Sequence, residues 1–78
     1  MSVEERVSRV LVEGIGIDPG EVMPDAGLKS KLGIDSTEMV EVLVALEKEF
    51  GLKVPDGIIG NDSTVRDLVN YFSRTITN

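Results

Sequence analysis

The chain has 78 residues, which is enough for one small domain and too short for a cofactor domain beside a substrate domain. Asp and Glu total 14 against 8 Lys and Arg, and the net charge of −6 argues against binding to nucleic acid or to an anionic membrane surface. The sequence contains no His and no Cys, so it lacks the commonest general base and any thiol nucleophile, and we do not expect an enzyme.

The first predicted helix runs from about Ser2 to Gly14. Ser2 precedes two acidic residues, as expected of a helix cap followed by an acidic first turn. Gly14 and Gly16 end the helix. The residues that share its apolar face by helical spacing are Val3, Val7, Val10, Leu11 and Gly14.

The next stretch, residues 18–33, is irregular, with turns marked by Pro24, Asp25 and Gly27. Leu28 and Leu32 are spaced four apart, so one helical turn could carry both side chains into the core. A long first loop in so small a domain is expected either to pack tightly or to serve function.

The strongest periodic signal runs from Ser36 to Phe50 and predicts an amphipathic helix. Gly51 follows in the usual C-terminal glycine position. The apolar side of this helix comprises Met39, Val42, Leu43, Leu46 and Phe50, and the opposite side comprises Glu38, Glu41, Ala45 and Lys48.

The segment after Gly51 contains only short periodic patterns. Pro55 disfavours helix at Val54, and residues 56–61 predict a single helical turn or an irregular loop. A last helical face follows, and the polar tail from Ser73 is expected to fray; the face comprises Val65, Leu68, Val69 and Phe72. No run predicts a strand. The fold class is therefore all-α: a small four-helix bundle of three main helices and a short, irregular third one, with a long first loop.

One polar pair stands at the start of the acidic helix. Asp35 is placed as its N-cap, with Glu38 three residues later as in a capping box. Ser36 then lies on the first turn, where a phosphoester would meet the positive end of the helix dipole. Spacing alone favours an ordinary capping pair over a modification site. The acidic residues do not follow the EF-hand spacing, and no metal site is predicted.

The stretch LGIDSTEMVEVLVALEKEFGLKVPD, residues 32–56, closely resembles the central segment of acyl carrier proteins. The last helix, residues 64–72, also resembles the family's ending, so the likeness covers nearly the whole chain as one domain, residues 1–78. The matching positions are Leu32, Gly33, Asp35, Ser36, Ala45, Leu46, Glu47, Phe50, Val54, Pro55 and Asp56.

The resemblance implies that Ser36 carries 4′-phosphopantetheine, attached from coenzyme A by a phosphopantetheinyl transferase. It implies that Asp35 helps to dock this transferase and to orient the magnesium in the transferase's own site. The thiol of the arm would carry acyl groups as thioesters for fatty-acid or specialised lipid or polyketide biosynthesis. An imported thiol fits a chain without Cys, and a carrier is not itself a catalyst.

The resemblance also implies contacts with acyl-transferring or acyl-modifying synthase enzymes that present basic patches. The partner-binding residues would be Glu38, Glu41, Glu47, Asp56 and Val44. The residues of a core that can admit the acyl chain would be Met39, Leu43, Leu46, Phe50, Val54 and Ile59. The N-terminus lacks the order of a secretory signal and no apolar run could span a bilayer, so we expect a cytoplasmic monomer.

The chain departs from the family pattern at several positions. Thr37 replaces an apolar residue, Lys29 and Lys31 lie in a loop that is usually acidic, and residues 57–62 are unusual. These changes suggest a specialised carrier rather than the housekeeping one. Two alternatives stay open: a peptidyl or aminoacyl carrier, and a carrier-like helical module that has lost modification and only binds partners.

Overall fold

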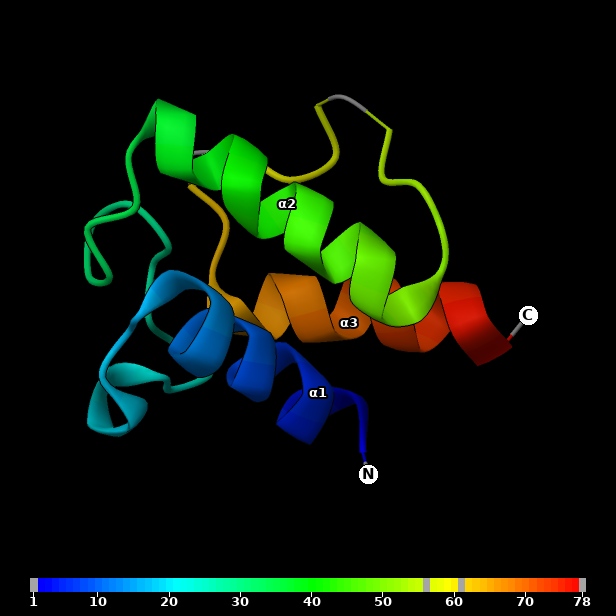
Figure 1. Cartoon of the computed structure of the whole chain (residues 1–78), viewed down its shortest axis with the longest axis horizontal. Coiled ribbons are helices and arrows are strands. Elements are labelled where there is room, and N and C mark those ends of the chain that lie inside the picture. The colour runs from blue at the N-terminus through cyan, green and yellow to red at the C-terminus, as the bar shows by residue number, and fades with distance from the viewer. Residues whose placement is uncertain (1, 56, 61, 78) are drawn as a thin grey trace.

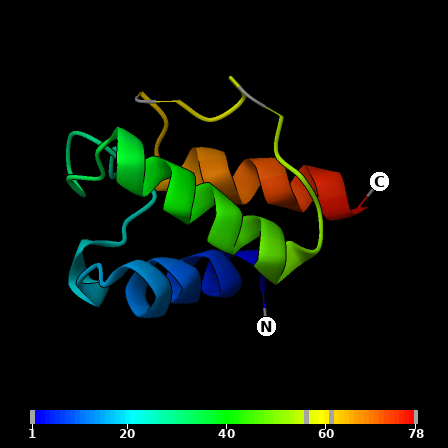
Figure 2. The same ribbon diagram turned by 45° about the horizontal axis from the view of Figure 1, so that its top comes forward.

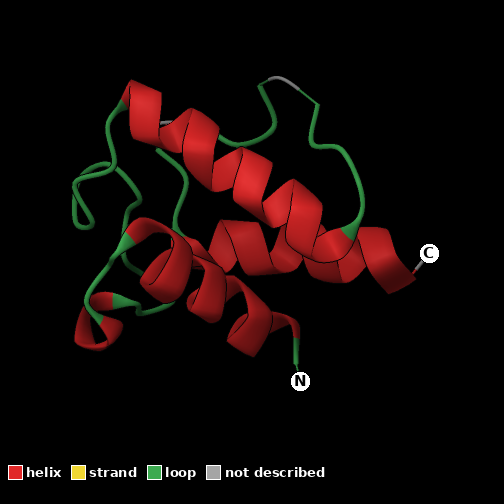
Figure 3. Cartoon of the chain, viewed as in Figure 1, coloured by secondary structure: helices red, strands yellow, loops and turns green. Residues whose placement is uncertain are grey.

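The computed structural model of the chain describes residues 2–55, 57–60 and 62–77 (Figure 1). Three α-helices form in this part: α1 (Val3–Arg9), α2 (Ser36–Phe50) and α3 (Val65–Thr77). A π-helical segment, η1 (Val10–Ile15), continues α1, and a single 3₁₀ turn, η2 (Pro19–Glu21), follows it. No strand is present among these residues, and Figure 3 shows helices joined by loops. The predicted all-α class is confirmed.

The capping of α1 follows the sequence prediction. The Ser2 hydroxyl accepts a hydrogen bond from Glu5 N at 3.1 Å, and Ser2 N donates to the Glu5 carboxylate at 3.0 Å. Hydrogen bonding of the Glu5 carboxylate to the main chain of Ser2, and then to its side chain, holds the pKa of Glu5 below its ordinary value. Nothing in the sequence predicted that α1 continues into the wider π-helical segment η1. Gly14, predicted on the apolar face, is exposed because the wider π-helical turn shifts the angular spacing of side chains.

Helix α2 has the predicted bounds and ends at Gly51, which adopts the left-handed conformation with φ 69°. Val42 and Leu46 are fully buried, whereas Leu43 and Phe50 are only partly buried against the core. Helix α2 packs on η1, and α1 packs on α3 (Figure 2).

Phe50 joins the three helices at the C-terminal end of α2. Its ring stacks on that of Phe72 in α3, with 4.4 Å between ring centroids, and the Arg6 guanidinium of α1 lies 4.3 Å from its centroid. Arg6 also donates to the Glu49 carboxylate and to the Glu49 carbonyl oxygen, each at 2.8 Å. Phe50, predicted on the apolar side of this helix, therefore closes α2 against α1 and α3.

The first connection, residues 16–35, is fastened to the beginning of α3. The side chains of Leu28 and Leu32 in this connection are buried in the core, as predicted. An isolated antiparallel bridge pairs Gly27 with Thr64. Three main-chain hydrogen bonds run beside this bridge: Leu28 N to Ser63 O, Val65 N to Ala26 O, and Arg66 N to Pro24 O.

The second connection, residues 51–64, runs back alongside α2 to the start of α3 (Figure 1). Val54 and Ile59 are buried, and Ile58 is 51% exposed. Residues 57–60 form a turn and bends, so the fourth helix is not confirmed in the described part; Asp56 lies outside it. Glycines at both ends of the pair Ile58 and Ile59 disfavour a helix there.

Helix α3 continues to Thr77, so the tail from Ser73 is helical in its described part, and its fraying stays a prediction. The side chain of Thr75 bonds back to the carbonyl oxygen of Tyr71 at 2.8 Å, within the segment that was expected to fray. None of the described helices is long and apolar enough to cross a membrane.

Candidate functional site

Asp35 caps α2 as predicted. Its carboxylate accepts a hydrogen bond from Glu38 N at 2.8 Å, and Asp35 N donates to the Glu38 carboxylate at 3.4 Å. The two residues form the reciprocal capping box, which satisfies main-chain donors that no helical bond reaches. Both carboxylates are therefore engaged in starting the helix, and the Glu38 side chain is half-buried.

Ser36 is the first residue of α2, and its side chain is exposed. Its hydroxyl forms no hydrogen bond with any residue that the structure describes. The chain that leads to it is fixed, because Ile34 is 1% exposed and Ile34 N donates to Leu28 O at 3.0 Å. The structure thus holds a free hydroxyl at the positive end of a helix of 15 residues.

An exposed stripe of α2 continues from this hydroxyl. Thr37, Val40 and Val44 follow Ser36 at helical spacing, and Val40 and Val44 are 62% and 43% exposed. Glu41 lies beside them and is also exposed. Sequence analysis named Val44 and Glu41 and missed Val40. Its position four residues after Ser36 was the signal, since this places both on one face of a helix.

Glu47 differs from the other acidic residues of α2. Its side chain is half-buried, and its carboxylate accepts a hydrogen bond from Val54 N at 2.8 Å. The predicted role of Glu47 in partner binding stays a prediction, and the structure adds a contact within the chain. Asp56, also predicted to bind partners, lies outside the described residues.

The six residues predicted to admit an acyl chain come together in the structure. They lie in or against one hydrophobic core between α2, the second connection and α3. Four of them are buried and two are partly buried: Met39 7%, Leu46 0%, Val54 9% and Ile59 8% exposed, with Leu43 and Phe50 packed against them. Their side chains fill this region, so an acyl chain could enter only by displacing some of them.

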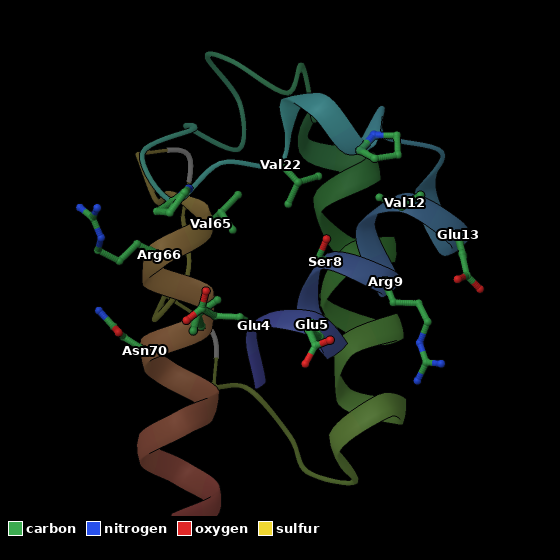
Figure 4. A pocket seen from close by; sticks show the side chains of 13 residues that line it. Glu4, Glu5, Ser8, Arg9, Val12, Glu13, Val22, Val65, Arg66 and Asn70 are labelled. Atoms are coloured by element: carbon green, nitrogen blue, oxygen red, sulfur yellow. The ribbon is translucent and has the colours of Figure 1, made fainter. Parts of the chain in front are cut away.

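A groove of about 750 Å³ lies elsewhere, between α1, η2 and α3. Its lining includes Ser8 and Arg9 of α1 and Arg66 and Asn70 of α3, which Figure 4 labels. None of the residues predicted to admit an acyl chain lines it. Sequence analysis did not foresee this groove, because its lining comes from segments far apart in the chain.

The described residues contain no cluster of three or more side chains suited to holding a metal ion. At the start of α2, the exposed Ser36 hydroxyl offers an oxygen for a covalent bond to a cofactor. The geometry fits an attached phosphodiester, because the hydroxyl is exposed and the nearby helix N-terminus favours negative charge.

Comparison with known proteins shows that the sequence of the chain is similar to that of proteins with a phosphopantetheine attachment site. Residues 5–72 match the family described as "Phosphopantetheine attachment site". The acyl carrier protein of Zymomonas mobilis subsp. mobilis is 37% identical over 67 residues, which cover 86% of this chain and 86% of that protein. Acyl carrier proteins carry acyl groups on covalently bound 4′-phosphopantetheine and are not enzymes themselves. They interact with phosphopantetheinyl transferase and with biosynthetic enzymes. The chain belongs to the acyl carrier protein family of phosphopantetheine-binding carriers.

Proposed function

We propose that Ser36 is the residue that receives the 4′-phosphopantetheine arm. The observation that carries the proposal is the exposed, unbonded Ser36 hydroxyl at the first position of α2, next to the Asp35 cap. The Ser63 hydroxyl is less available, because Ser63 is half-buried and accepts a hydrogen bond from Gly60 N at 3.0 Å.

The attachment transfers phosphopantetheine from coenzyme A. The Ser36 oxygen attacks the phosphorus that bears the pantetheine, a new P–O bond forms, and the pyrophosphate bond breaks with adenosine 3′,5′-bisphosphate as the leaving group. The hydroxyl proton passes to a base of the transferase, since this chain has no His and Asp35 is occupied as the cap. The helix N-terminus then favours the negative charge of the phosphodiester.

The exposed stripe of α2 is the proposed docking surface for the transferase and for synthase enzymes. Val40 and Val44 offer apolar contact, and Glu41 offers charge to a basic patch on the partner. Charge complementarity of this kind speeds encounter and sets orientation more than it adds affinity. We include Glu38 and Glu47 in the proposal as secondary contacts, because their carboxylates also bond within the chain.

We further propose that the acyl chain enters between α2 and the second connection, beside Leu46, Val54 and Ile59. These side chains are apolar and buried, and the described residues from 53 to 60 make one hydrogen bond to a helix, from Val54 N to the Glu47 carboxylate. We also propose that a short third helix, as in the family, can form within the second connection. The carrier is proposed to be a cytoplasmic monomer that works in fatty-acid or related biosynthesis.

Mass spectrometry tests the attachment site. The unmodified protein is incubated with coenzyme A, magnesium and a phosphopantetheinyl transferase of broad specificity, and we expect a gain of one phosphopantetheine. Ser36→Ala should abolish the gain while the circular dichroism of the helices is preserved. Ser63→Ala is the matched control and should be modified as the wild type is.

Gain of the arm by Ser36→Ala, or its loss in Ser63→Ala, would contradict the assignment. No gain in any variant would instead favour the unmodified interaction module.

A further inference from the structure

Glu47 directs the chain where it leaves α2 for the second connection. Its main-chain carbonyl oxygen accepts hydrogen bonds from Gly51 N at 2.8 Å and from Leu52 N at 3.2 Å. Its carboxylate reaches further along the chain and accepts from Val54 N at 2.8 Å. One residue therefore binds three N–H groups of the turn that brings Val54 to the core.

Among the described residues from 53 to 60, the bond from Val54 N to the Glu47 carboxylate is the only hydrogen bond that reaches a helix; the others stay within the connection, as from Ile58 N to Pro55 O. Pro55 follows directly and has no N–H to donate. A hydrogen bond to a carboxylate in a partly buried place is stronger than one between neutral groups.

We propose that the Glu47 carboxylate is a latch that holds the second connection closed over the core, and that its release lets an acyl chain enter beside Val54. This inference rests on the proposed acyl site. Val54 and Ile59, 9% and 8% exposed, fill that region, so entry requires the connection to move. Glu47 then acts as a positioning residue, through the main chain of Val54, and sets how readily the carrier shelters its cargo.

Glu47 and Glu41 form a natural pair for testing this role. Both are carboxylates of α2, and neutralising either one would remove a negative charge from a docking surface. Only the Glu47 side chain is half-buried and bonded to the main chain; the Glu41 side chain is exposed and bonds to no described residue. A variant that keeps an acceptor oxygen but loses the charge therefore separates the latch from docking.

Hydrogen exchange of the Val54 amide, followed by NMR on the unmodified protein, measures the latch directly. Glu47→Ala removes the acceptor without disfavouring the helix, and we expect the Val54 amide to exchange about tenfold faster or more. Glu47→Gln keeps an amide oxygen at the same place and should restore much of the protection. Glu41→Ala and Glu41→Gln, the matched controls, should leave this amide unchanged.

Unchanged exchange at Val54 in Glu47→Ala would overturn the latch. Equal acceleration of Val54 exchange in Glu47→Gln and Glu47→Ala would overturn it as well. Both variants remove the charge and only Glu47→Gln keeps an acceptor oxygen, so equal effects would mean that the charge alone matters.

The effect on cargo is measured with the arm loaded by a butanoyl or a decanoyl group, after mass spectrometry has shown the arm on Ser36. Hydroxylamine attacks the thioester carbonyl and releases the free thiol, so slower release reports a sheltered chain. The decanoyl thioester of Glu47→Ala should be cleaved more slowly than that of the wild type, by up to about tenfold, since the equilibrium shifts by no more than the lost hydrogen bond. The butanoyl thioester should respond less.

The two proposals fail separately in this design. Absence of the arm from Ser36 counts against the attachment site and leaves the exchange result standing. Equal cleavage of the decanoyl thioesters of wild type and Glu47→Ala, alongside faster exchange at Val54, overturns the control of acyl entry.

Discussion

The two long connections of this carrier are built in opposite ways. The first is fastened by main-chain hydrogen bonds to the start of α3 and to Ser63 just before it, and it buries Leu28 and Ile34. Between its two ends, in the described residues from 53 to 60, the second is held to a helix only by the bond from Val54 N to the Glu47 carboxylate. The first leads into Ser36 and the second lies beside the proposed acyl site. The difference indicates that the attachment point is held fixed while the neighbouring wall is free to move.

Replacing one buried aliphatic residue in each connection should show the largest effect. Leu28→Ala deletes a fully buried side chain in the fastened connection, and we expect a loss of about 2–5 kcal/mol, which is a large part of the stability of a small domain. Ile59→Ala should cost an amount near the lower end of that range, because a loosely held segment can settle into the space. Unfolding in urea measures both.

Equal losses for Leu28→Ala and Ile59→Ala would remove the contrast between the two connections. Exchange of main-chain amides in the two variants gives a second comparison, since Leu28→Ala should loosen the approach to Ser36.

One glycine in each connection offers a smaller test. Gly33 and Gly57 both have positive φ, 70° and 87°, and a Cβ at either would meet no atom within 4 Å. Alanine there is penalised only through the main chain, by about 1–2 kcal/mol. Gly33→Ala should show the full cost, whereas the second connection can rotate and relieve Gly57→Ala. Thermal midpoints that fall equally would mean that the second connection is as rigid as the first.

The sequence predicted the periodic parts of this fold well. The bounds of α2, the caps Ser2 and Asp35, and the buried Leu28 and Leu32 follow from local spacing and capping chemistry. The π-helical turn η1 did not, because its wider hydrogen bonding depends on what packs against it. The bond from Val54 N to Glu47 was also missed, because a helix carboxylate that accepts from the following loop leaves no periodic pattern in the sequence.

Acid should weaken the end of α2 from which the second connection starts. The hydrogen bond from Arg6 holds the pKa of Glu49 below its ordinary value of 4.5, aided by the charges of Arg6 and Arg9. The folded state therefore favours the ionised form. The stability it adds is complete above pH 4.5 and is lost as the pH falls through the lowered pKa. Since both side chains are partly exposed, the effect should be modest.

Thermal unfolding of wild type and Glu49→Gln checks the acid effect. At neutral pH the wild type should be the more stable, and the gap should close as the pH is lowered. If the difference in thermal midpoint between wild type and Glu49→Gln persists in acid, it comes from packing on Phe50 rather than from the charge of Glu49.

The smallest effect on stability, and the most specific effect on partners, is expected for charge reversal at Glu41. Its side chain is exposed on the helix between the two connections, so Glu41→Lys should change stability by less than about 0.5 kcal/mol and leave both connections intact. It should slow the attachment of phosphopantetheine to Ser36, mainly in association, and the defect should fade with added salt. Lys53→Glu, an exposed reversal of opposite sign in the second connection, is the comparison. Equal rates for Glu41→Lys and wild type at low salt would mean that Glu41 is only solvated, and the exposed loop bearing Lys29 and Lys31 would become the surface to test.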